Sequence, residues 1–118
     1  MPHYLIQASY SAQSISGLIS SGEDRSGVIT SLVEGMGGKV ESQYQCFGDY
    51  DMMIVLELPD NVSMAALSMV AGASGGLTNF KTTVLIPISQ GVEAARKAAG
   101  IGYRPPGEIG RASCRVRV

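Results

Sequence analysis

The fold of this chain is decided by residues 39–58, which read KVESQYQCFGDYDMMIVLEL. An extended stretch, residues 39–47, leads into a turn of glycine and acidic residues, and a short apolar stretch follows the turn. Apolar side chains alternate along this last stretch, at Met52, Ile54, Leu56 and Leu58. Glycine and aspartate favour tight turns, and a period of two is typical of a strand buried on one face. Residues 39–58 therefore predict a β-hairpin.

The residues before the hairpin predict one strand and one helical segment. Residues 4–10 alternate: one face carries Tyr4, Ile6, Ala8 and Tyr10, and the other carries His3, Leu5, Gln7 and Ser9. From Ser11 to Met36 the apolar spacing changes to three and four residues, which indicates an amphipathic helix. Gly22 and Gly27 each weaken a helix by about 1 kcal/mol relative to alanine, so we expect a break near residues 20–24.

The residues after the hairpin complete the pattern. Asp60 can cap a helix that closes in the glycine-containing residues 72–76. Residues 77–86 alternate again and are stopped by Pro87, and residues 91–99 suit a short last helix. The order βαββαβ followed by a helix predicts an α+β, ferredoxin-like fold, with an antiparallel four-stranded sheet and its helices on one face.

Such a sheet has a second face that no helix covers. That face is mixed in character, since it carries Leu5, Tyr44, Val55 and Thr83 rather than a row of charges. The chain is 45% hydrophobic and only 16% charged, which is high for a small monomer. We therefore expect a homodimer, or a higher oligomer of such dimers, in which two sheets pair face to face around a cavity.

Composition and charge exclude several classes of partner. No apolar run approaches the roughly 20 residues that cross a bilayer, and the first residues lack a secretory signal, so we expect a cytoplasmic protein. A formal net charge of -1 gives no footprint for nucleic acid. The two cysteines, Cys46 and Cys114, have no metal-ligand spacing with the single histidine, so neither a structural zinc nor another cofactor is predicted.

The C-terminal residues look foreign to the rest of the chain. We predict one domain over residues 1–104 and a separate segment over residues 105–118, which opens with the breaker Pro105-Pro106-Gly107. Residues 108–118, EIGRASCRVRV, have no hydrophobic period and resemble the translation of a sequencing-library adapter, as in a truncated metagenomic sequence. We expect the natural C-terminus to be missing.

Several short motifs resemble the GYD domain family. They are the run Phe47-Gly48-Asp49-Tyr50-Asp51, the strand end Glu57-Leu58-Pro59-Asp60, the opening strand Tyr4 to Tyr10, and the turns Gly37-Gly38 and Ser74-Gly75-Gly76. The resemblance covers residues 2 to about 88. It implies the dimeric α+β barrel form of the ferredoxin-like fold. Because members of that family are largely uncharacterised, it implies a fold rather than a reaction.

The uncovered face holds the candidate ligand-binding residues, which are Gln7, Ser9, Tyr44, Glu57, Asn79 and Lys81, together with His3. Polar groups that converge on an apolar wall are typical of a small-molecule site. The alternative is structural: these groups hydrogen-bond across the subunit interface, and Glu57 pairs with Lys81.

Three functions follow from these residues. The first is a small-molecule-binding or accessory domain whose ligand lies between the sheets of a homodimer. The alternative is a small cofactor-independent enzyme of monooxygenase, isomerase or cyclase type, in which His3 and Tyr44 handle protons. The third is a metal site through His3 with Glu57 or Asp51.

The hairpin turn is itself a candidate. Its residues Gly48, Asp49, Tyr50 and Asp51 include two carboxylates that could act as acid and base or hold a cation. Glycine and aspartate are also what a turn requires, so the structural interpretation is favoured.

Overall fold

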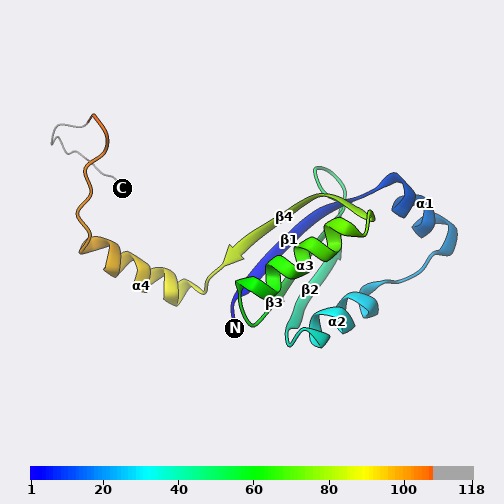
Figure 1. Cartoon of the computed structure of the whole chain (residues 1–118), viewed down its shortest axis with the longest axis horizontal. Coiled ribbons are helices and arrows are strands. Elements are labelled where there is room, and N and C mark those ends of the chain that lie inside the picture. The colour runs from blue at the N-terminus through cyan, green and yellow to red at the C-terminus, as the bar shows by residue number, and fades with distance from the viewer. Residues whose placement is uncertain (108–118) are drawn as a thin grey trace. The chain divides into compact units, whose positions relative to one another are not determined.

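The computed structural model describes residues 1–107, which form two compact units that divide after Ile86. The first unit contains β1 (His3–Tyr10), α1 (Ala12–Ser21), α2 (Ser26–Gly35), β2 (Lys39–Gln45), β3 (Met52–Glu57), α3 (Asn61–Ala73) and β4 (Leu77–Leu85) (Figure 1). The second unit contains α4 (Ile88–Ala99). The predicted adapter-like tail, residues 108–118, lies outside the described residues, and the predicted boundary at residue 104 stays a prediction.

The four strands form one antiparallel sheet in the order β2-β3-β1-β4. Each helical crossover joins two strands that follow each other in the chain but are not adjacent in the sheet: β1 to β2 through α1 and α2, and β3 to β4 through α3. The split βαβ arrangement requires such crossovers. This confirms the predicted ferredoxin-like α+β fold. Several boundaries differ slightly from the prediction: β1 begins at His3, β2 ends at Gln45, β3 ends at Glu57, β4 ends at Leu85, and α4 begins at Ile88.

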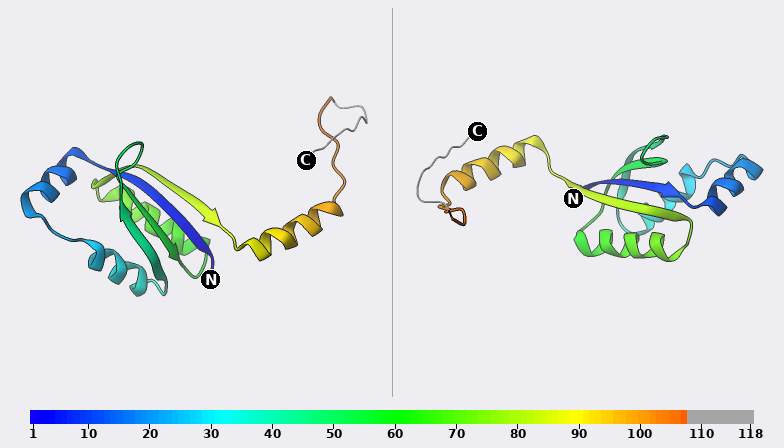
Figure 2. Two further views of the ribbon diagram at one scale, coloured as in Figure 1. Left: turned by 180° about the vertical axis from the view of Figure 1, so that it is seen from behind. Right: turned by 90° about the horizontal axis from the view of Figure 1, so that it is seen from above.

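The hydrophobic core lies between the sheet and the helices α2 and α3. The right-hand view of Figure 2 shows α3 along one side of the sheet. The core residues come from both layers, with Tyr4, Ile6, Ala8, Ile54 and Leu56 on the strands and Val33, Met64 and Leu67 on the helices. Because side chains alternate across a strand, these strand residues share one face, as the period of two predicted.

The predicted break in the first helical segment is present. α1 begins at a serine cap, where Ser11 Oγ accepts a hydrogen bond from the Ser14 N–H. It ends at Gly22, whose φ of 62° is a conformation that glycine adopts without steric penalty. α1 buries no residue, whereas α2 buries Val33 in the core.

The predicted hairpin is present, and its turn is hydrogen-bonded into the sheet. The Cys46 N–H donates to the Asp51 carbonyl at 2.8 Å, and the Asp51 N–H donates to the Ala8 carbonyl at 2.9 Å. The Asp51 side chain accepts a hydrogen bond from the Tyr10 N–H at 3.0 Å. Asp51 therefore holds the turn against β1, which supports the structural interpretation of this residue.

Two irregularities interrupt the strand pairing, and the sequence pattern predicted neither. The β2–β3 register shifts between Val40 and Ser42, and the β1–β4 register shifts between Gln7 and Ser9. A β-bulge places two residues of one strand opposite one residue of its partner, so it changes which side chains share a face. Among the described residues, no helix is long and apolar enough to cross a membrane.

Candidate functional site

The candidate site lies on the sheet face opposite α2 and α3, which we call the open face. At its centre Leu5 pairs with Val55 on one side and with Thr83 on the other. Gln7 pairs with Met53 and with Lys81 in the same way. Within residues 1–86, neither α2 nor α3 packs on this face, so apolar and polar side chains stand side by side at the surface.

At one end of the open face, His3 lies between two glutamates. Its Nε2 atom is 3.1 Å from an Oε atom of Glu41 and 3.7 Å from an Oε atom of Glu57. The three residues come from three adjacent strands, since β3 lies between β1 and β2. Their side chains are 30%, 37% and 20% exposed, respectively, so the cluster is half-buried and remains open to solvent.

Glu41 reaches this cluster because of the bulge in β2. Val40 pairs with Leu56 and Ser42 pairs with Val55, which leaves Glu41 as the extra residue between them. Strict alternation counted back from Tyr44 would place Glu41 on the helix-covered face of the sheet. Because of the bulge, Glu41 lies on the open face instead. Glu41 could not be placed here from the sequence, because no residue in the stretch marks a bulge.

The structure brings some of the predicted ligand-binding residues together. His3 and Glu57 are neighbours, and Gln7 lies opposite Lys81 further along β1. Within one chain Glu57 does not pair with Lys81, because its carboxylate lies beside the His3 imidazole instead. The register explains this, because Lys81 lies opposite Gln7, four residues along β1 from His3.

The other predicted residues lie apart from the histidine cluster. Tyr44 pairs with Met53 on the open face and is 64% exposed. The Ser9 hydroxyl donates to the Asp49 carbonyl at 3.5 Å, at the hairpin end of β1. Asn79 lies at the β1–β4 irregularity with a φ of 50°, a left-handed conformation that asparagine tolerates.

Of the two carboxylates considered as metal partners of His3, only Glu57 lies close to it. Asp51 binds the backbone of Tyr10, at the opposite end of β1 from His3. The hypothesis that His3 and Asp51 bind one metal ion is therefore wrong, because the length of β1 separates the side chains of His3 and Asp51.

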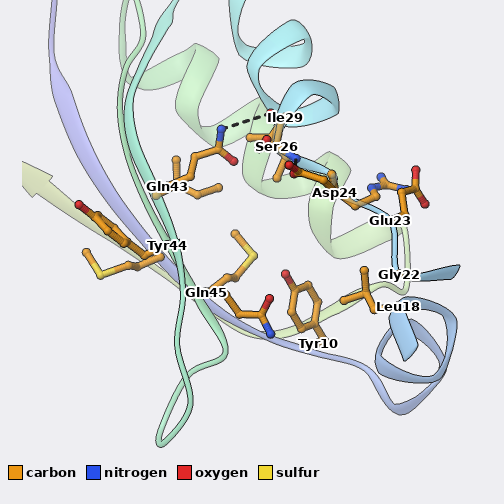
Figure 3. A pocket seen from close by; sticks show the side chains of 14 residues that line it. Tyr10, Leu18, Gly22, Glu23, Asp24, Ser26, Ile29, Gln43, Tyr44 and Gln45 are labelled. Carbon is orange, nitrogen blue, oxygen red and sulfur yellow. Dashed lines mark hydrogen bonds between the residues drawn. The ribbon is translucent and has the colours of Figure 1, made fainter. Parts of the chain in front are cut away.

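A pocket of about 470 Å³ opens on the other side of the sheet, between the α1–α2 connection and strands β2 and β3 (Figure 3). Its polar lining includes Tyr10, Asp24, Arg25, Gln43 and Gln45. Burial and the nearby Asp51 carboxylate raise the pKa of Tyr10. Tyr44 is also among the residues that line this pocket, although in Figure 3 its side chain points to the opposite side of the strands from Tyr10.

This pocket was not predicted from the sequence. One signal was present: Gln43 and Gln45 occupy inward positions of β2, where an ordinary core strand carries apolar residues. Gln43 uses its amide to donate to the Ser26 carbonyl and to the Thr30 hydroxyl, both at 3.2 Å. Its role in the described structure is to tie β2 to α2.

The fold and the open face define a ferredoxin-like α+β domain with a polar cluster at one end of its exposed sheet. The family model described as GYD domain matches residues 4–95, which is most of the chain. The chain therefore belongs to the GYD domain family, as the motifs around the hairpin predicted.

The other comparisons are distant. A solved structure titled "crystal structure of FFRP-DM1" shares 14% sequence identity, with a TM-score of 0.48; the match covers 73% of this chain and 100% of that one. No curated protein matches the chain.

Proposed function

We propose that this domain binds a small molecule and works as a homodimer, with the ligand held between the open faces of two copies. The observation that carries the proposal is the composition of the open face. Leu5, Met53 and Val55 form an apolar centre, and polar side chains surround it. An apolar surface with a few convergent polar groups is the usual lining of a small-molecule site once it is enclosed.

Enclosure requires a second body, because α2 and α3 pack on the opposite face of the sheet. A second copy is the simplest occupant: a twofold pairing lets the same patch cover itself. The mixed surface suits such a pairing, in which the apolar centres of the two copies meet. The polar side chains at the ends of the open face then border the space left for a ligand.

Sedimentation analysis of the purified chain tests the dimer. We expect the native protein to be dimeric at micromolar concentration and Val55→Arg to be monomeric, because the substitution buries a charge without a partner in the interface. Val62→Arg is the matched control, since Val62 lies on α3 and is 78% exposed. It should leave the dimer intact.

The variants Val55→Arg and Val62→Arg also test whether the dimer retains a small molecule. Small molecules extracted from the denatured native protein and from Val62→Arg should include one species that Val55→Arg does not retain. A native protein that is monomeric at micromolar concentration would contradict the proposal. A dimer without any retained or added small-molecule ligand would reduce the proposal to an interaction domain.

One observation favours an enzyme as the second candidate. The His3 imidazole lies 3.1 Å from the Glu41 carboxylate, and a carboxylate that orients a histidine is a common arrangement for proton transfer. Tyr44 does not join this pair, because it lies beside Met53 toward the other end of β2. Conversion of the retained small molecule by the native protein, with binding but no conversion by His3→Asn, would establish this candidate.

A further inference from the structure

We propose that His3, Glu41 and Glu57 bind one divalent transition-metal ion at the end of the open face. The site goes beyond the proposed function and does not depend on the dimer, because all three ligand atoms belong to one copy. The nitrogen and the two carboxylate oxygens lie within 4.8 Å of one another.

The geometry already approximates that of a metal site. Bonds of about 2.1 Å to nitrogen and oxygen ligands place neighbouring ligand atoms about 3 to 3.5 Å apart. The measured separations from His3 Nε2 are 3.1 Å to Glu41 and 3.7 Å to Glu57. Small rotations of the two glutamate side chains therefore suffice to bring all three atoms around one ion.

The three ligand residues lie on adjacent, hydrogen-bonded strands of the sheet. His3 is paired in the sheet with Glu57 on β3, and Glu57 is paired with Lys39 on β2, so backbone hydrogen bonds fix the spacing of the three strands. The bulge in β2 turns Glu41 toward the same face. A site on adjacent strands requires little ordering when the ion binds, which favours affinity.

The charge balance favours a cation between these residues. Two carboxylates converge on one imidazole, and in the part of the chain that the structure describes no lysine or arginine forms an ion pair with either carboxylate. Lys39 is the register partner of Glu57, yet no ion pair joins their side chains. Whether His3 is neutral or protonated, the three side chains retain a negative charge, which a divalent ion neutralises.

The donor set indicates the class of metal. Imidazole nitrogen suits zinc, iron, copper and nickel, whereas carboxylate oxygens also suit manganese. One nitrogen with two oxygens therefore selects a first-row transition ion over calcium or magnesium, which prefer oxygen ligands alone. Three protein ligands leave positions on the ion open toward the solvent side of the face, where a ligand's oxygen or nitrogen can coordinate.

Calorimetric titration with Zn²⁺ tests the proposal on the full chain, without a histidine tag and in a buffer that does not chelate metal. We expect one ion per chain. His3→Ala, Glu41→Gln and Glu57→Gln should each weaken binding by at least about ten-fold, since each removes a direct ligand. Glu34→Gln, a matched change at an exposed position on α2, should bind as the native chain does.

Two further measurements separate the alternatives. Cys46→Ser should leave the Zn²⁺ affinity unchanged, which excludes the half-buried free thiol as the ligand. Circular dichroism should show that every variant is folded, because the three ligands are partly exposed. Absence of saturable binding at millimolar Zn²⁺, equal binding by His3→Ala, or equally tight Ca²⁺ binding would each overturn the proposal.

Discussion

The assignment of the two sheet faces carries both proposals, and a pair of leucine substitutions tests it. Leu56 on β3 points into the core and is fully buried, with 0% of its surface exposed. Leu5 on β1 lies on the open face and is half-buried. The same change, leucine to alanine, therefore probes the two faces of one sheet with identical chemistry.

The expected magnitudes follow from burial. Leucine to alanine removes three carbons, and at about 0.8 kcal/mol per buried CH₂ the transfer contribution is about 2.4 kcal/mol at Leu56. The cavity left beside the core residues raises the total to about 3–5 kcal/mol. Leu5→Ala in a single copy should lower the free energy of unfolding by only about 1 kcal/mol, because water already reaches part of that side chain.

Urea unfolding followed by circular dichroism measures both values, and it is run at a low and at a hundred-fold higher protein concentration. Dimerisation stabilises the folded state by mass action, so the effect of Leu5→Ala should grow with concentration if the open faces pair. The effect of Leu56→Ala should not. If Leu56→Ala does not fold, Ile54→Val, at a 4% exposed core position, should lower the unfolding free energy by about 0.5–1.5 kcal/mol.

One result would refute the face assignment directly. At the lower concentration, an effect of Leu5→Ala equal to or larger than that of Leu56→Ala would mean that Leu5 is the core residue. The open face, its histidine cluster and the proposed ligand space would then have no structural basis.

Two further predictions concern the helix ends. Asp60→Ala should lower the melting temperature, because the Asp60 carboxylate accepts the Ser63 N–H at 2.8 Å and caps α3. That hydrogen bond lowers the pKa of Asp60 below its ordinary value, so the stabilisation is present at neutral pH and is lost as the pH falls through the lowered pKa; melting curves of the native and variant chains should converge in acid. Gly38→Ala should lower the unfolding free energy by about 1–3 kcal/mol, because an added Cβ falls against the Glu57 carbonyl. Gly35→Ala, where the Cβ meets nothing within 4 Å, should leave stability unchanged or raise it by about 0.5–1 kcal/mol in chemical denaturation.

Most of the secondary structure followed from short-range patterns. The alternation around Leu56 and around Ile6 placed both strands and their buried faces, because a period of two is a property of the strand itself. Gly22 and Asp60 marked a helix end and a helix start by their own backbone and side-chain chemistry. The order of these elements was sufficient to predict the ferredoxin-like fold.

The candidate site was predicted only in part. His3 and Glu57 lie on the open face, as the alternation along their strands predicted. Glu41 was not predicted to lie on the open face or to belong to the candidate site. Its position depends on a bulge in β2, which arises from how β2 pairs with β3 rather than from any residue preference within β2. The pocket lined by Gln43 was missed because it forms between β2 and the α1–α2 connection, which are separated along the chain, and the inward-facing glutamines of β2 were its one local sign.

The amino-acid sequence by itself determined the elements, the two faces of the central strands, the hairpin and the family, because each depends on residues close together in the chain. Only the tertiary structure decided that His3, Glu41 and Glu57 meet, and that Asp51 and Lys81 do not join them. Contacts between side chains of different strands depend on the order and register of the strands, because a register shift of one residue changes which side chains are neighbours.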